Sequence, residues 1–333
     1  MSQSRSRLNG CYIAAAMFCA VAIFGVVPAT GQVARAWPSK PVHMILVFPA
    51  GGALDVITRP IDEKLSAMLG QPFIVDNRPG ASGLIATEAA AHAPADGYTF
   101  LMASNTSFMA PRFLHKRLSY DPEGFEPVSL VCFLPNILVG NLSLPANNLT
   151  ELIAYMKANP GKLTFGSPGT GSFGHLEGEM LKLAASVNIV HVPFKGLTDA
   201  IPALLGGHIS LYFEPAVTGL ARVTSGKVKA FGVTGARRLP LAPSIPTIAE
   251  QGFSGSDILP WMGLVAPGGT SKEITEKLGS ALNQILVMPD IVAKLTSMGV
   301  EPRGGSAEEF AALIKSELPR YDRIFKAAGI TPQ

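Results

Sequence analysis

Cysteine is scarce in this chain of 333 residues, which contains three. Two of them, Cys11 and Cys19, lie in an N-terminal stretch that we predict is removed, so Cys132 is left alone. This excludes an internal disulfide, and the fold must therefore depend on its hydrophobic core. The six histidines show none of the spacings typical of metal sites, so we expect neither a metal nor another cofactor.

A surplus of charge of either sign is also missing. The whole chain has 27 Lys and Arg against 24 Asp and Glu, but Arg5, Arg7 and Arg35 lie in the N-terminal stretch, which contains no acid. The remaining chain is formally neutral. This composition argues against a surface for nucleic acid or for anionic membranes, and we predict neither partner.

The N-terminal stretch, residues 1–36, has the organisation of a secretory signal peptide. Arg5 and Arg7 precede an almost wholly apolar run over residues 11–27, and residues 34–36 offer the small side chains that a signal peptidase reads. The apolar run is short for a bilayer span, which needs about 20 residues. A retained single-pass anchor is the alternative. We predict cleavage, export to the periplasm and no membrane insertion of the mature protein.

Two glycine-rich turns each separate a strand pattern from a helix pattern. The first is Pro49-Ala50-Gly51-Gly52, and the second lies within residues 166–174. The first N–H groups of a helix lack partners inside the helix and lie at its positive dipole end, and glycine lets a ligand come close to them. Neither turn contains Lys or Arg. Each turn is therefore a candidate site for a carboxylate or a phosphate held by backbone N–H groups and hydroxyls.

Strand and helix patterns alternate along the rest of the chain, which indicates an α/β fold with mostly parallel sheets flanked by helices. A mature chain of just under 300 residues suits two lobes better than one. We place the first crossing between lobes in residues 127–139 and the return in residues 259–266. The predicted first lobe comprises residues 37–133 and 262–333, and the second lobe comprises residues 134–261. Each lobe would direct one glycine turn at a shared cleft.

Local signals also predict where several helices begin and end. Three pairs of residues have the spacing of a capping box, namely Asn148 with Glu151, Thr270 with Glu273, and Ser306 with Glu309. Pro60 should kink the helix that follows the first turn, because an interior proline lacks a hydrogen-bond donor. For the same reason we expect the last helix to end before Pro319.

The order of the motifs is that of a known family. In sequence they are residues 37–41, 49–52 with Asp55, 76–80, 96–99, 169–172 with His175, 191–196, and Trp261 with residues 263–267. Taken together they resemble the Bug family, the extracytoplasmic solute receptors of tripartite tricarboxylate transporters. The resemblance covers essentially the whole mature chain.

This resemblance implies a two-lobed periplasmic binding protein of the type II-like kind, with a hinge of two crossing strands. Such a protein closes on a small carboxylate and delivers it to the permease subunits of the transporter. It is not an enzyme, and we expect a monomer. Some such receptors serve in sensing instead.

The resemblance also implies ligand-binding residues on both turns, because family members hold one ligand carboxylate between them, partly through ordered waters. Carried over residue by residue, the implied contacts are Ala50, Gly51, Gly52 and Asp55 in the first lobe, and Ser167, Gly171 and Ser172 in the second. We add five candidates on the same turns and strand ends, namely Asn105, Thr170, Phe173, His175 and Glu214.

Three positions near the predicted cleft depart from the family pattern. Pro168 replaces the usual alanine, Phe173 stands where a small polar residue is common, and Glu214 stands where the family has Asp. Together with Phe108, Phe173 would make the distal part of the cleft apolar. We therefore predict an aromatic or aliphatic carboxylate, dicarboxylates included, rather than citrate.

Two enzyme-like alternatives have weaker support. Gly169, Gly171 and Gly174 fit the Gly-x-Gly-x-x-Gly fingerprint of a dinucleotide-binding protein, but the acid expected about 20 residues later is missing and Lys195 stands there. A secreted α/β hydrolase is the other alternative, yet no serine has the Gly-x-Ser-x-Gly context of a nucleophile.

Several candidate residues also have structural alternatives. Asp55 in the first turn of a helix can stabilise that helix without touching a ligand. His175 can be a hydrogen-bond donor at the start of its helix, and His191 a packed strand residue. Trp261 fits hinge packing as well as it fits a cleft wall.

Overall fold

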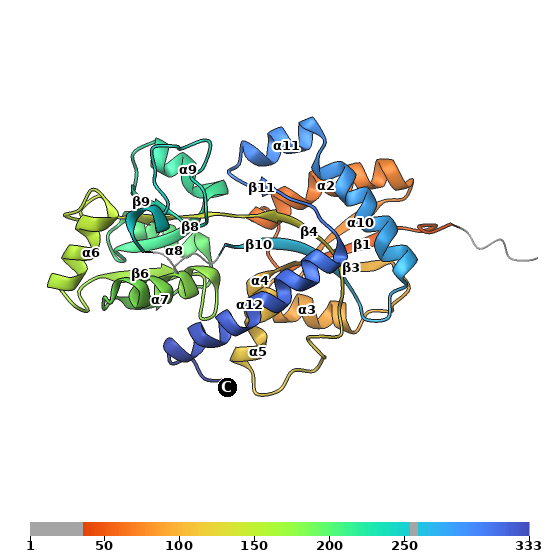
Figure 1. Cartoon of the computed structure of the whole chain (residues 1–333), viewed down its shortest axis with the longest axis horizontal. Helices are drawn as coiled ribbons and strands as arrows, with labels where there is room; N and C mark the ends of the chain where they lie inside the picture. Colours follow the sequence, from red (N-terminus) through yellow and green to blue (C-terminus); the bar gives the residue numbers. More distant parts are fainter. Residues whose placement is uncertain (1–35, 254–258, 333) are drawn as a thin grey trace, which may run out of the picture. The chain divides into compact units, whose positions relative to one another are not determined.

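The structure is a computed structural model that describes residues 36–253 and 259–332 (Figure 1). Residues Trp37–Gln333 form one compact unit. The predicted signal peptide lies outside the described residues. Within the described ranges, no helix is both long enough and apolar enough to cross a membrane.

The first sheet has six strands in the order β11-β4-β10-β3-β1-β2. They are β1 (Val42–Leu46), β2 (Phe73–Asn77), β3 (Thr99–Ser104), β4 (Glu126–Phe133), β10 (Trp261–Ala266) and β11 (Glu301–Pro302). The helical elements connected to it are α2 (Ala53–Leu69), η1 (Ala81–Gly83), α3 (Leu84–Ala91), α4 (Asn105–Met109), α5 (Pro111–Leu114), α10 (Lys272–Leu286), α11 (Pro289–Thr296) and α12 (Ala307–Ala327). We call this part of the chain the first lobe.

The second sheet has five strands in the order β7-β6-β8-β5-β9. They are β5 (Asn136–Gly140), β6 (Thr164–Ser167), β7 (Val190–Pro193), β8 (Leu211–Pro215) and β9 (Lys229–Val233). The helical elements connected to it are α6 (Leu149–Ala158), α7 (Phe173–Ala185), α8 (Leu197–Leu205), α9 (Ala216–Thr224) and η2 (Ala249–Gln251). We call this part the second lobe, and it is drawn in green to teal in Figure 1.

The predicted α/β fold with two sheets is confirmed, and in both sheets most strands share one direction. β1, β2 and β3 are parallel, as are β6, β7 and β8, because each is joined to the next through a helix. The strands that follow a crossing run against their neighbours: β5 is antiparallel to β8 and β9, and β10 is antiparallel to β3 and β4. The sheets are therefore mixed at the crossings.

The two crossings lie close together. β4 ends at Phe133 in the first sheet and β5 begins at Asn136 in the second, so only Leu134 and Pro135 join the sheets there. On the return, Trp261 begins β10 and pairs with Phe133. All residues of β5 and β10 are buried, which agrees with the continuous apolar runs of both segments.

The last helix, α12, connects the cores of the two lobes. It contacts β4 of its own lobe and α7 of the second lobe. Leu176 and Met180 of α7 belong to the same buried apolar cluster as Tyr321, Ile324 and Phe325 of α12. Two different lobes therefore share one continuous hydrophobic core at this point.

One predicted helix end and one predicted helix cap are wrong. α12 continues through Pro319 to Ala327, because its second half packs Tyr321 and Phe325 in the core and this burial offsets the cost of about 3 kcal/mol for an interior proline. α10 begins at Lys272 after Ser271, and the Thr270 hydroxyl donates to Pro267 O at 2.7 Å instead of capping the helix.

Of the other signals, the N-cap residues Asn148 and Ser306 are confirmed, and the kink at Pro60 stays a prediction. Asn148 caps α6 through Glu151 N, and Ser306 with Glu309 forms a capping box at α12. α2 runs through Pro60 without interruption.

Two carboxyl groups, Glu177 fully buried and Glu317 partly buried, lie beside the first residues of the crossing strands. Asn136 of β5 donates from Nδ2 to Glu177 Oε2 at 2.7 Å, and Trp261 of β10 donates from Nε1 to Glu317 Oε2 at 2.7 Å. Burial raises the pKa of Glu177 to about 8 and that of Glu317 to about 7. Both groups therefore hold a proton more strongly than an exposed glutamate does.

We expect thermal stability to fall as the pH rises above neutrality, and to fall less in Glu177→Gln. A carboxyl with a raised folded pKa contributes stability that is complete below its ordinary pKa of 4.5 and is lost as the pH rises through about 8. Glutamine keeps the acceptor for Asn136 but cannot ionise. At about pH 9 the variant should melt roughly 3 °C or more above wild type in circular dichroism scans.

The matched control is Glu63→Gln, at an exposed position of α2. It should keep the wild-type dependence of Tm on pH. A Glu177→Gln variant whose Tm follows the wild-type pH curve would contradict the argument.

Candidate functional site

The carboxyl ends of β1, β2 and β3 meet at one edge of the first sheet. Leu46 at the end of β1 pairs with Asn77 at the end of β2 and with Met102 of β3. The first glycine turn follows β1, and Asn105 follows β3. Ligands of open α/β sheets bind at this edge of the sheet, outside the ends of the strands.

The first turn has a defined backbone geometry. Gly51 has φ +77°, which favours glycine, and Gly52 is the extended N-cap residue of α2 with φ −72° and ψ 169°. Gly52 N donates to Pro49 O at 3.1 Å, and Gly51 N donates to Asp55 Oδ2 at 3.0 Å. Gly52 has no side chain, so the N-cap residue provides no side-chain acceptor for the first N–H groups of α2.

The second turn repeats this geometry. Gly171 has φ +78°, and Ser172 is the extended N-cap residue of α7 with φ −70° and ψ 163°. Ser172 N donates to Gly169 O at 3.2 Å, and Gly171 N donates to His175 Nδ1 at 3.0 Å. The Ser172 hydroxyl does not cap α7 and donates to Gly169 O at 2.6 Å. In both lobes, the third helical residue thus accepts the N–H of a left-handed glycine.

Asp55 is the acceptor in the first lobe, and its carboxylate has several protein partners. Arg59 donates to it from Nε at 2.8 Å and from Nη2 at 2.7 Å, and Asn77 donates from Nδ2 at 3.1 Å. The Arg59 guanidinium holds the pKa of Asp55 below its ordinary value. Asp55 therefore positions the first turn, as the structural alternative predicts, and its contact with a ligand stays a prediction.

His175 is the acceptor in the second lobe, and it is supported by His191. The two rings stack with their centroids 3.8 Å apart and 15° between their planes. Burial lowers the pKa of His175 to about 3 and that of His191 to about 4, so both rings are neutral near pH 7. Because Nδ1 of His175 accepts from Gly171, the predicted role of His175 as a donor to the helix start is wrong.

Ser167 ties this pair of rings to the turn. Its Oγ lies 2.6 Å from His191 Nε2 and donates to Gly169 O at 3.0 Å. Ser167 is fully buried at the end of β6. The sequence reasoning missed the role of His191. That role depends on the register of β6 with β7, in which Phe165 pairs with His191, and the sequence alone carries no signal for it.

Asn105 and Glu214 also have protein partners. Asn105 Oδ1 accepts from Trp261 N at 3.3 Å, which ties the end of β3 to the return crossing. Glu214 is fully buried in β8 and forms an ion pair with Arg222 of α9, whose Nε lies 3.0 Å from Oε1. The predicted contact of Asn105 and Glu214 with a ligand stays a prediction.

The aromatic candidates differ in their positions. Phe108 is 5% exposed and packs against Phe125 with ring centroids 5.4 Å apart, so it lies in the core and not on a cleft wall. Phe173 is partly buried and packs against the apolar cluster of the first lobe. Thr170 is exposed at the tip of the second turn.

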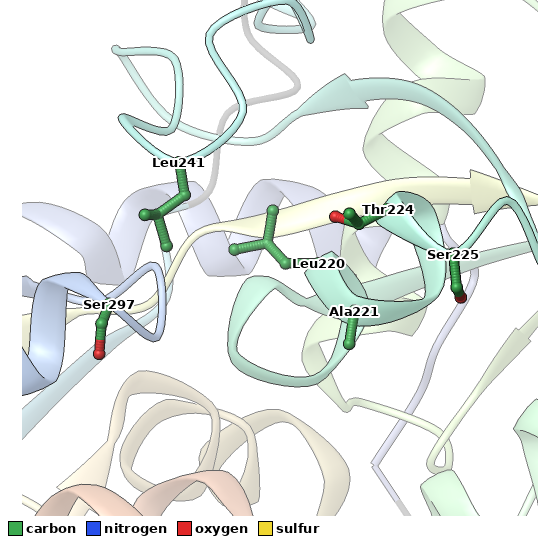
Figure 2. A pocket seen from close by; sticks show the side chains of 6 residues that line it. All are labelled: Leu220, Ala221, Thr224, Ser225, Leu241 and Ser297. Atoms are coloured by element: carbon green, nitrogen blue, oxygen red, sulfur yellow. The ribbon is translucent and has the colours of Figure 1, made fainter.

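Two cavities lie away from both turns. The first, of about 400 Å³, is lined by Leu220, Ala221, Thr224 and Ser225 of α9 with Leu241 and Ser297, as Figure 2 shows. The second, of about 910 Å³, lies between α10 and the start of α12 and includes Glu126, Glu276 and Glu308 in its wall. The first cavity has no charged side chain in its wall and the second is rich in carboxylates, so neither suits an anion.

Comparisons with known proteins bear on the family and on the fold. The family described as "Tripartite tricarboxylate transporter family receptor" matches residues 57–330. The solved structure of the periplasmic binding protein BugD is 35% identical, with a TM-score of 0.80, covering 89% of this chain and 100% of BugD.

Two further solved structures contain a ligand. Rpa4515 of R. palustris with adipate is 34% identical, with a TM-score of 0.82, and the match covers 89% of this chain and 100% of that one. MatC (Rpa3494) of Rhodopseudomonas palustris with bound malate is 29% identical, with a TM-score of 0.77, and the match covers 86% and 99%.

The positioning role of Asp55 leads to a stability prediction. Asp55→Ala should lower the free energy of unfolding by roughly 1–3 kcal/mol, because the Gly51 N–H and the Asn77 amide lose their acceptor. Arg59 lowers the folded pKa of Asp55, so this contribution is complete above the ordinary pKa of 3.8 and is lost as the pH falls through the folded value. Urea denaturation at about pH 7 and about pH 3 measures both effects.

Asp76→Ala is the matched control, because Asp76 also pairs with an arginine, Arg78, at 2.8 Å, but 34% of its side chain is exposed. That pair should contribute less than about 1 kcal/mol. Equal losses in the two variants at neutral pH would refute the assignment.

Proposed function

Because this chain belongs to the tripartite tricarboxylate transporter receptor family, to which the Bug proteins belong, we propose that it captures a small organic carboxylate in the periplasm for a membrane permease. The members of this family and the solved relatives are substrate-binding receptors, not enzymes. The hydrolase and dinucleotide alternatives are therefore set aside.

The observation that carries the proposal is the repeated turn geometry. Two helices, one in each lobe, begin after a left-handed glycine and an extended N-cap residue that supplies no side-chain cap. Each such helix start attracts an anion through its N–H groups and its dipole, worth about 0.3–1 kcal/mol when exposed and up to about 2 kcal/mol when partly buried. A carboxylate held by Gly52, Ser172 and their neighbours would contact both helix starts.

The absence of Lys and Arg from both turns fits a carrier protein. A ligand held only by backbone N–H groups and hydroxyls is released without breaking a strong ion pair. The neutral rings of His175 and His191 add no charge that would retain it.

A short aliphatic dicarboxylate is the ligand class that we propose first. Two solved relatives contain adipate and malate, and both ligands carry two carboxylates. Phe173, which is partly buried beside the second turn, offers an apolar surface to the carbon chain between the two carboxylates. Aromatic acids fit the same surface and belong in the test.

Delivery to a permease is the second part of the proposal. Its support is the predicted signal peptide over residues 1–36 together with family membership. The released protein would act as a monomer and carry its ligand between the cell surface and the permease.

The test is a thermal-shift screen followed by calorimetry with adipate, malate, citrate, benzoate and a nicotinamide dinucleotide. A ligand at 100 times its dissociation constant should stabilise the protein by about 2.7 kcal/mol. Ser172→Ala should weaken binding of that ligand about tenfold, because the Ser172 hydroxyl would turn from Gly169 O to the carboxylate and a hydrogen bond to a charged group is worth about 1.5–3 kcal/mol.

Ser316→Ala in α12 is the matched control and should bind like wild type, since Ser316 is exposed and bonds only to Leu313 O. If no carboxylate raises the melting temperature, or if only the dinucleotide does, the proposed function is wrong.

A further inference from the structure

We propose that Leu114 determines ligand affinity and lobe closure by packing directly on Gly171 of the second turn. Leu114 is the last residue of α5 in the first lobe, and Gly171 precedes the N-cap of α7 in the second. The inference rests on the proposed function, because Leu114 would exclude water from the same site at which the ligand carboxylate is proposed to bind.

The contact between the two residues is close. A Cβ atom placed on Gly171 would lie 2.7 Å from Leu114 Cδ1 and 3.4 Å from Cδ2 and Cγ. The isobutyl group of Leu114 therefore covers the Cα of Gly171, and any side chain at position 171 would collide with it. Gly171 is buried although it lies in a turn.

Neighbouring aromatic side chains extend this contact. We call Leu114, Phe113, Phe173 and Phe325 together the apolar seam. Phe113 stacks on Phe325 of α12 with ring centroids 4.9 Å apart and 21° between the planes. Leu114, Phe113 and Phe173 all pack against the same buried cluster of the first lobe. Phe173 is the residue after Ser172, so the seam lies directly beside the free N–H groups of α7.

Covering these N–H groups changes their electrostatics. A hydrogen bond from a backbone N–H to a carboxylate is stronger where water is excluded, because the effective dielectric constant falls. An apolar side chain on Gly171 excludes water without offering a competing hydrogen bond. Leu114 should therefore slow ligand release more than it speeds capture, as is usual when contacts at a formed interface change.

The position of Leu114 also limits ligand shape. Its side chain packs on Gly171 of the second turn, and Phe173 stands two residues after that glycine. In this proposal, the part of the ligand beyond the bound carboxylate contacts these two apolar side chains. Unbranched carbon chains meet this condition better than chains with a charged or hydroxylated branch near the bound carboxylate.

The first experiment compares Leu114→Ala with wild type in calorimetry and stopped-flow release of adipate, or of malate if adipate does not bind. We expect binding about tenfold weaker, mostly through a faster dissociation rate, because a partly buried leucine contact is lost. Leu114→Met, which conserves volume, should restore most of the affinity. Leu205→Ala is the control, since Leu205 is 43% exposed at the end of α8.

The second experiment needs no ligand. Nitroxide labels are attached to cysteines introduced at Ile85 of α3 and Leu183 of α7, which are 50% and 53% exposed. Pulsed electron paramagnetic resonance then measures the distance between the lobes. Cys132, the free cysteine among the described residues, is buried and should escape labelling. Leu114→Ala should shift the distribution to longer distances, and Leu205→Ala should not.

The outcomes separate the two proposals. If wild type binds adipate or malate and Leu114→Ala matches it in affinity, release rate and distance distribution, the inference is overturned and the proposed function stands. If wild type binds neither acid, a dicarboxylate receptor is refuted, and the distance measurement alone decides whether Leu114 locks the lobes.

Discussion

The hydrogen bond from a left-handed glycine to the third residue of the following helix is the contact on which both candidate turns depend. In the first lobe Gly51 donates to Asp55, and in the second Gly171 donates to His175. The two acceptors differ in charge. A carboxylate close to an anion site is repulsive, and the Arg59 guanidinium on Asp55 offsets that repulsion. A neutral imidazole needs no such charged partner, and the His175 ring stacks on His191 and on Phe165. The same backbone geometry is thus held by two different chemistries.

The crossings between the lobes are held by a second set of buried polar groups. Glu177 and Glu317 accept from the first residues of β5 and β10, and Tyr321 of α12 lies fully buried near them. A raised pKa keeps Glu177 mostly protonated at neutral pH and Glu317 about half protonated, so the crossings carry hydrogen bonds and less charge than two ordinary glutamates would. Rearranging an uncharged hydrogen bond costs less free energy than separating a buried ion pair. In the proposed receptor, this composition would suit a hinge.

Local patterns predicted the strand–turn–helix units and the caps of α6 and α12, because those features depend on neighbours within four residues. The errors concern contacts that local patterns do not encode. Phe108 lies in the core because Phe125 from a later segment packs on it, and α12 passes Pro319 because residues of α5 and α7 pack with its second half. The pairing of Ser167 with His191 depends on the register of β6 with β7. Sheet order and register are set by the whole core, and a single sequence does not display them.

A receptor that holds an anion without a cation must obtain its affinity from dipoles, and dipoles are effective only where water is excluded. In the proposed receptor, water exclusion at the second turn requires the first lobe, because Leu114 belongs to α5 and not to the turn itself. Ligand binding and lobe contact are then two parts of one equilibrium. By linkage, the factor by which the Leu114 contact strengthens binding equals the factor by which bound ligand strengthens the contact. The small residue at position 171 is therefore required twice, once for its positive φ and once for the space that Leu114 fills.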